Sequence, residues 1–207
     1  MPQSTAEWAD SLGISPDLVP PPAEVGTLDW PYSAGQIAVR ALAIQGVVAA
    51  AFGVDSRPII EWFKDQGIWA AATAKERAFL ELPERPEDAV ARLRWQQEAE
   101  WTLLWAIGMV DALGLPTRCC DTRRLVDEIL PPLGGDTDGF IADAALRPPR
   151  ELLAEDDRTY NLWCYAVAAN RSGTLPDDLI WNVLYQRRYA FEWLAGPDEW
   201  DRVSCDA

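Results

Sequence analysis

Hydrophobic residues recur at steps of three and four positions along most of the chain. The clearest stripe follows Ala34 and consists of Ile37, Ala41, Ile44 and Val48. This spacing places the four side chains on one face of a helix. No stretch alternates hydrophobic and polar residues over the length of a strand. With glycine and proline as helix ends, the pattern predicts helices over residues 34–53, 58–66, 73–81, 87–113, 121–130, 140–146, 150–170 and 177–195.

Local signals support two of these helices. Thr73 followed three positions later by Glu76 is a capping box, in which each side chain accepts a hydrogen bond from the other residue's backbone N–H. Residues 101–110 are apolar on nearly every side, as in a helix enclosed by others. We therefore expect residues 87–113 to form the longest helix and to lie at the centre, closed by Gly114 and Pro116.

The first 33 residues differ in composition from the rest. They are rich in proline, which disfavours helix, and their five acidic residues face no cation within the segment. We expect an extended, acidic, Pro-rich arm over residues 1–33, with Trp8 and Trp30 as candidate contact points, followed by one helical domain over residues 34–207. The predicted fold is an all-α, single-domain bundle of about seven or eight helices.

Length and composition agree with a folded domain. The chain has 207 residues, of which 49% are hydrophobic and 25% charged, enough to build one core. The N-terminal segment has no basic residue and no apolar run, and no segment approaches the roughly 18 apolar residues that span a membrane. Four cysteines without a CxxC spacing are expected to be reduced thiols. The expected location is the cytoplasm.

The chain carries a net charge of −15, from 33 acidic and 18 basic residues. Such a charge repels the phosphates of nucleic acids and of anionic membranes, so we expect neither as a partner. It favours association with a basic protein or a cationic ligand. Acidity that only keeps the protein in solution is the simpler alternative.

The residue types present limit the chemistry. The chain contains no histidine, which excludes Ser-His-Asp and Cys-His catalytic groups and histidine metal ligands. No Gly-rich phosphate-binding loop with its following lysine is present. The adjacent thiols of Cys119 and Cys120 point in different directions and chelate one metal poorly. We therefore assign no catalytic residue, no cofactor and no metal site.

Arg187 is the least expected residue of the last predicted helix, because it falls in the middle of an apolar stripe. That stripe consists of Ile180, Val183, Leu184, Phe191 and Leu194. A guanidinium group there needs carboxylate or carbonyl partners. We expect Trp200 to fold back onto the helical body, and Asp201 or Asp206 to meet Arg187 or Arg147. Such a contact is either a fold-stabilising salt bridge or part of a ligand-binding pocket.

Asp111 directly follows the apolar run at residues 101–110. Two interpretations stay open at this point. Its carboxylate is drawn into the core, where it needs a partner, or it lies at a helix end in contact with water.

Several short segments resemble one bacterial protein family. They are Arg-Ala-Leu-Ala at 40–43, Leu-Leu-Trp-Ala-Ile-Gly at 103–108, Ala-Leu-Arg-Pro at 145–148, Tyr-Asn-Leu-Trp at 160–163, Ala-Phe-Glu-Trp-Leu at 190–194 and Glu-Trp-Asp-Arg-Val-Ser at 199–204. In this order they are similar to the bacterial domain of unknown function 4272 family, over roughly four-fifths of the chain. The resemblance implies a bacterial helical domain and implies no specific activity.

Two functions are consistent with these observations. The first is a non-catalytic, acidic interaction module that binds a basic protein partner. The second is a small-molecule-binding protein or enzyme with an Arg-carboxylate-Trp pocket near Arg187, formed with Asp201 and Trp200. An exposed aromatic patch surrounded by acids would favour the first function, and a closed pocket with converging polar groups would favour the second.

Overall fold

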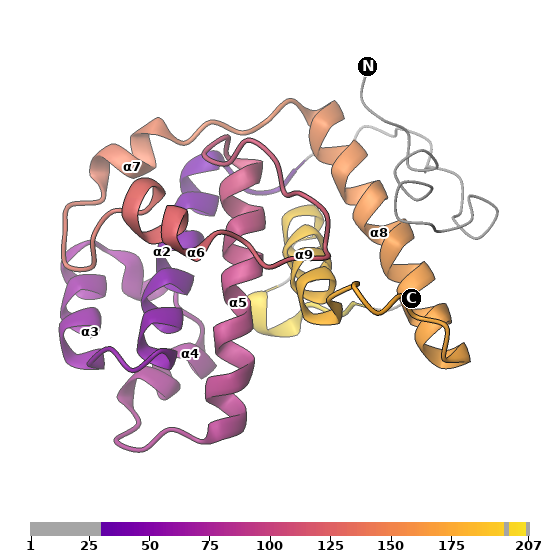
Figure 1. Cartoon of the computed structure of the whole chain (residues 1–207). Helices are drawn as coiled ribbons and strands as arrows, with labels where there is room; N and C mark the ends of the chain where they lie inside the picture. Colours follow the sequence, from indigo (N-terminus) through magenta and orange to yellow (C-terminus); the bar gives the residue numbers. More distant parts are fainter. Residues whose placement is uncertain (1–29, 197–198, 206–207) are drawn as a thin grey trace.

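The computed structural model describes residues 30–196 and 199–205 (Figure 1). These residues contain eight α-helices and no strand, which confirms the all-α, single-domain prediction. The predicted arm at residues 1–33 lies almost wholly outside the described residues. The helices are α2 (Ala34–Ala51), α3 (Ser56–Asp65), α4 (Ala74–Glu81), α5 (Glu87–Ala106), α6 (Thr122–Arg124), α7 (Asp138–Asp143), α8 (Pro149–Ser172) and α9 (Trp181–Ala195).

The centre of the molecule is α5, which packs against α2 on one side and α9 on the other (Figure 1). Leu103 and Leu104 of α5 and Phe191 of α9 are fully buried in this core. The predicted stripe on α2 contributes Ile37 and Ile44 to the same cluster. Each such side chain stabilises the fold by about 1.5–3 kcal/mol relative to an exposed one. On the other side of α9 lies α8.

A second cluster joins α2 to α3 and α4, through side chains that include Leu42, Phe63 and Phe79. Gly46 permits this close approach, because a Cβ atom there would lie 2.4 Å from the Phe63 ring and 2.8 Å from the Ile59 side chain. Helix α2 is therefore enclosed by both clusters.

The central helix is shorter than predicted, since α5 ends at Ala106 and the longest helix is α8, with 24 residues. The chain after Ala106 is irregular and turns at Gly108, where φ is +81°, while Ile107, Val110 and Leu113 remain buried. Partners from a later segment satisfy the freed carbonyl groups. The backbone N–H of Arg147 donates to Ala106 at 2.9 Å, and that of Ala145 donates to Ile107 at 3.2 Å.

These hydrogen bonds also explain why α7 ends at Asp143, rather than extending to the predicted residue 146. Helix α9 begins at Trp181, later than the predicted residue 177. Its preceding residue, Ile180, is extended and donates its backbone N–H to the carbonyl of Pro116 at 2.9 Å. In both places a hydrogen bond to a distant segment fixes the boundary of the helix, the end of α7 and the start of α9.

The expectation that no segment is long and apolar enough to cross a membrane is wrong for α2. Within the described part of the chain, Ala34–Ala51 alone meets that criterion of length and composition. In this structure 72% of the stretch is buried against other helices. Core helices of this kind meet the same criterion as membrane spans.

Candidate functional site

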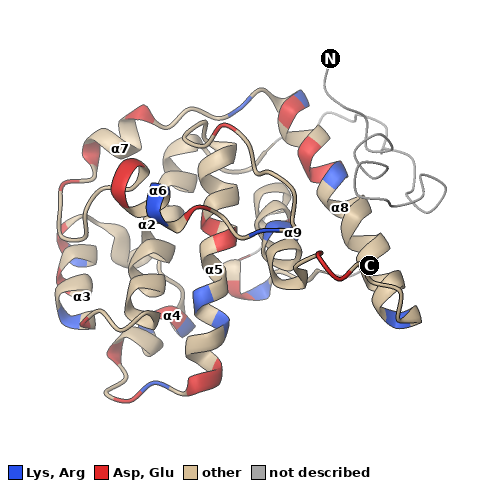
Figure 2. Cartoon of the chain, viewed as in Figure 1, with Lys and Arg blue, Asp and Glu red and all other residues tan. Residues whose placement is uncertain are grey.

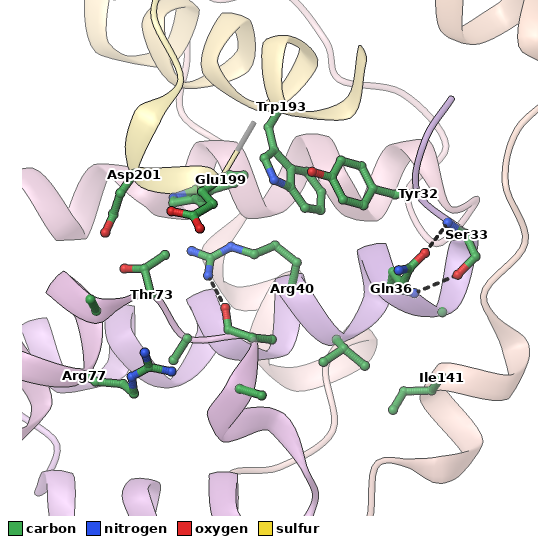
Figure 3. Close-up of a pocket in the computed structure, with 17 residues that line it drawn as sticks. Tyr32, Ser33, Gln36, Arg40, Thr73, Arg77, Ile141, Trp193, Glu199 and Asp201 are labelled. Atoms are coloured by element: carbon green, nitrogen blue, oxygen red, sulfur yellow. Dashed lines mark hydrogen bonds between the residues drawn. The ribbon is translucent and has the colours of Figure 1, made fainter. Parts of the chain in front are cut away.

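A pocket of 760 Å³ lies between the first half of α2, the start of α4 and the 3₁₀ turn Trp200–Arg202 (Figure 3). It is termed the Arg40 pocket below. Its walls come from residues 32–40, 70–77 and 199–201, together with Ile141 of α7 and Trp193 of α9. A second pocket, of 480 Å³, lies between α4, α5 and α9 and shares Asp201 with the first.

Arg40 forms part of the inner wall and is only 3% exposed. Its Nη1 donates to Glu76 Oε2 at 2.9 Å and to the carbonyl of Ala71 at 2.7 Å, and its Nη2 donates to Glu76 Oε1. The guanidinium carbon lies 4.4 Å from the centroid of the Trp200 ring, a cation–π contact. The charge of Arg40 is thus balanced within the protein, and the group is held from three directions.

The start of α4 positions Glu76. Thr73 Oγ1 accepts a hydrogen bond from the Glu76 N–H at 3.2 Å, and Glu76 Oε2 accepts one from the Thr73 N–H at 2.9 Å. This is the capping box predicted from the sequence. It turns the Glu76 carboxylate back toward α2, where the carboxylate meets Arg40. The same motif therefore begins a helix and orients a buried ion pair.

Aromatic side chains form one wall of the pocket. Tyr32 stacks on Trp193, with ring centroids 4.1 Å apart and planes 15° from parallel (Figure 3). Trp200 makes edge contacts with Trp193 at 5.5 Å and with Tyr189 at 5.0 Å. The Tyr189 hydroxyl donates to the Trp200 carbonyl. These contacts attach the C-terminal turn to α9 and make one side of the pocket lining aromatic.

Charged side chains of both signs border the pocket. Glu199 and Asp201 come from the C-terminal turn, and Arg77 comes from α4 (Figure 3). Glu199 Oε2 lies 3.5 Å from the Nε of Arg202, and both side chains are exposed. Among the described residues, neither Arg77 nor Asp201 has an ion-pair partner.

Glu100 of α5 is a buried acid near Arg40. It is 1% exposed, and its Oε1 has no hydrogen-bond partner in the described part of the chain. Burial raises the pKa of this carboxyl group well above its ordinary value, and the positive charge of Arg40 opposes that effect. Glu100 lines neither of the two pockets. Glu100 is therefore a buried acid of the core near Arg40 and is separate from the pocket lining.

Comparison with known families identifies the chain at the level of a family. Residues 3–203 match the model of the family described as Domain of unknown function (DUF4272). The chain belongs to this family. No curated protein and no solved structure matches the chain.

Three of the segments that resemble the DUF4272 family meet at the Arg40 pocket. Arg40 begins the segment at 40–43, Trp193 lies in the segment at 190–194, and the C-terminal turn lies in the segment at 199–204. These segments are far apart in the sequence and share one place in the fold. This convergence makes the Arg40 pocket the candidate site of the domain.

Arg187 is buried, with 3% exposure, and Asp201, one of its two predicted acidic partners, does not pair with it. Its Nη1 donates to the carbonyl of Gly114 at 2.6 Å, and its Nη2 donates to that of Leu113 at 2.8 Å. Burial lowers the pKa of Arg187, and the negative charge of Glu98 opposes this. Arg187 lines neither the Arg40 pocket nor the second pocket. It therefore holds the end of the irregular segment at residues 107–114, as a structural group.

Arg147 also bonds to carbonyl groups instead of the C-terminal acids. It donates to Trp105 at 2.7 Å and to Val110 at 2.6 Å, and it pairs with Glu151 at 3.1 Å. Asp111 lies at the surface, where its carboxylate is 3.2 Å from Arg124. Of the two interpretations of Asp111, the structure therefore matches the exposed one.

The predicted C-terminal residues have different positions. Trp200 is 3% exposed and packs onto α9, as the expected folding back of the tail requires. Asp201 borders the Arg40 pocket and does not pair with Arg187 or Arg147. Asp206 lies outside the described residues.

Three residues were missed from the sequence: Arg40 and its partner Glu76 at the site, and the buried acid Glu100 in the core nearby. The signal that singled out Arg187, a cation inside an apolar stripe, applies equally to Arg40, the only charged residue of α2. Glu76 was noticed as a capping residue alone, because its second partner lies 36 positions away. Glu100 was not distinguished from the other acidic residues of α5, which are Glu87, Asp88 and Glu98.

Proposed function

We propose that this protein is a non-catalytic binding module that takes up a small amphipathic ligand in the Arg40 pocket. The observation that carries the proposal is a flat aromatic wall and unpaired charged side chains around one hollow of 760 Å³. Ligand pockets commonly measure about 300–1,000 Å³ and combine an apolar lining with a few polar groups. The Arg40 pocket has both properties.

Binding is favoured over catalysis because Arg40, the buried cation of the pocket wall, is already paired with the buried carboxylate of Glu76. Both Glu76 oxygens accept hydrogen bonds from Arg40, and one of them also accepts the Thr73 N–H. A general acid or base has to exchange protons with a bound substrate. A pre-formed pair, joined by two hydrogen bonds between its charged groups, is better suited to keep the wall of a binding site rigid.

A bulky residue at Val39 is expected to abolish ligand binding. Val39 is a half-buried residue of α2 that lines the Arg40 pocket and does not line the second pocket. In Val39→Trp the added ring occupies the space of the ligand. Suitable probes are phenylalanine, phenylalaninamide, N-acetylphenylalanine and N-acetylphenylalaninamide, which share one side chain and differ in charge. Calorimetric titration should show a loss of about tenfold or more for every probe that binds the wild type.

Val126→Trp is the matched control, because Val126 is 58% exposed and lines neither pocket. It should bind the probes as the wild type does. If no probe binds the wild type, or if Val39→Trp binds them unchanged, the Arg40 pocket is not a ligand site.

A second candidate function is the binding of a basic protein, favoured by the acidic surface around α7 (Figure 2). Asp136, Asp138 and Asp143 are exposed there and have no ion-pair partner within the described ranges. Val126 and Leu133, in the preceding segment, are exposed apolar side chains. Acids beside exposed apolar groups suit a partner that offers lysine or arginine.

This second function predicts binding of an oligolysine peptide that weakens about tenfold or more as the salt concentration rises from about 0.05 to 0.5 M. Replacing Asp136, Asp138 and Asp143 by asparagine should weaken the binding at low salt. Fluorescence anisotropy of a labelled peptide measures both effects. Binding that ignores salt, or that the triple replacement leaves unchanged, contradicts this function.

A further inference from the structure

The charged groups that line the Arg40 pocket differ in how far they are already neutralised. Arg40 is paired with Glu76 inside the protein, and Glu199 is close to Arg202. One cation, Arg77, and one anion, Asp201, have no ion-pair partner among the residues that the structure describes. The pocket therefore offers one positive and one negative group to a ligand.

Arg77 is held in place by contacts that leave part of its guanidinium group available to a ligand. Its Nη1 donates to the carbonyl of Trp69 at 3.2 Å, and its guanidinium carbon lies 5.9 Å from the centroid of the Trp69 ring. The other N–H groups of its guanidinium make no hydrogen bond with a residue of the described ranges. A half-buried guanidinium group with free donors is suited to a carboxylate.

Asp201 lies on a turn that is itself anchored. Its neighbour Trp200 is buried between Arg40, Tyr189 and Trp193. The half-buried Asp201 carboxylate makes no hydrogen bond within the described residues. A carboxylate in this position is suited to an ammonium group.

Arg77 and Asp201 project from different elements that border the same pocket, α4 and the C-terminal turn (Figure 3). Between the two charges and the Tyr32–Trp193 stack, Val39 and alanines of residues 70–74 supply apolar lining, beside the polar Thr73 and the internally paired Arg40. A ligand that matches this lining carries a negative group, a positive group and an apolar body.

We infer that the Arg40 pocket binds a small zwitterion with a hydrophobic side chain, an amino acid or a short peptide, with its carboxylate at Arg77 and its ammonium group at Asp201. This inference rests on the proposed function and adds the chemical class of the ligand. The aromatic wall receives the side chain of the ligand, and the two charges fix the orientation of its backbone.

The test compares three of the probes by calorimetry at pH 7. Phenylalanine carries both charges, phenylalaninamide carries the positive one, and N-acetylphenylalanine carries the negative one. Wild-type protein is expected to bind phenylalanine about tenfold more tightly than either derivative, since each derivative lacks one charge-assisted contact.

Two variants separate the contacts. Arg77→Gln should weaken phenylalanine and N-acetylphenylalanine about tenfold and leave phenylalaninamide unchanged. Asp201→Asn should weaken phenylalanine and phenylalaninamide and leave N-acetylphenylalanine unchanged. Circular dichroism spectra and unfolding midpoints that match the wild type control for folding.

Several results would contradict the inference that the ligand is a zwitterion. They are equal affinity for all three probes, tighter binding of one derivative than of phenylalanine, and equal weakening of every probe by both variants. If Val39→Trp still abolishes binding in those cases, the pocket remains a ligand site and only the ligand class is wrong. If no probe binds the wild type, both the ligand class and the site are wrong.

Discussion

Arg40→Met is expected to destabilise the protein by about 3–5 kcal/mol, the range observed when one partner of a buried ion pair is removed. The substitution leaves the carboxylate of Glu76 buried at 2% exposure without its cation. It also removes the donor to the Ala71 carbonyl and the cation over the Trp200 ring. Urea unfolding followed by circular dichroism measures the change in the free energy of unfolding.

Two comparisons show whether the buried pair is the cause. Arg57→Met removes an exposed ion pair, with Asp55 at 3.2 Å, and should change stability by less than about 1 kcal/mol. The double variant Arg40→Met/Glu76→Gln removes the uncompensated charge and should recover a large part of the loss. If Arg40→Met is no more destabilising than Arg57→Met, Arg40 does not organise this region.

Glu100→Gln is expected to change how stability depends on pH. Burial raises the pKa of Glu100 in the folded state well above its ordinary value. The folded protein therefore keeps this proton to a higher pH than the unfolded chain does. The contribution of the protonated carboxyl group is fully present below the unfolded pKa, near 4.3, and is lost as the pH rises toward the folded pKa.

Wild-type stability should consequently fall, relative to Glu100→Gln, by up to about 1.4 kcal/mol per pH unit above about pH 5. Urea unfolding of both proteins at pH 5, 6 and 7 gives the difference. Burial also raises the pKa values of Glu98, Glu155 and Asp156, the last to about 6. Those effects cancel because both proteins contain these groups. A difference that stays constant with pH contradicts the assignment to Glu100.

The exposed α3 residue Glu61 provides the matched control, as Glu61→Gln. One carboxyl group is replaced by an amide in both variants, so an effect of losing any one ionisable side chain would appear in both. The pH-dependent gain should be specific to Glu100→Gln.

Local signals in the sequence were sufficient to predict most helices. The capping box of Thr73 and Glu76 and the stop at Gly173 act within a few residues. Helix α4 therefore begins, and helix α8 ends, where the sequence predicts. The end of α5 could not be predicted in this way. Residues 107–113 are as apolar as a buried helix, and the groups that hold them in another conformation come from Arg147.

In the candidate site, as in the helices, the sequence predicted what depends on nearby residues and did not predict what depends on distant ones. Helical spacing correctly indicated that Arg187 is buried, because burial follows from the face of one helix. Its partners are carbonyl groups more than 70 positions away, and spacing along a helix carries no information about them. The Arg40 pocket combines segments from both ends of the domain, so its composition emerges only in the folded chain.

The central claim is that the Arg40 pocket is a ligand site, and the indole N–H signals of the tryptophans test it most directly. Two-dimensional NMR spectra recorded during a titration with phenylalanine resolve these signals. The account predicts that the signal of Trp193, in the pocket wall, shifts with ligand concentration. The signal of Trp62, which bonds to the Gly135 carbonyl at 2.7 Å and lines neither pocket, should stay in place. A titration in which the Trp193 signal does not move would contradict the account.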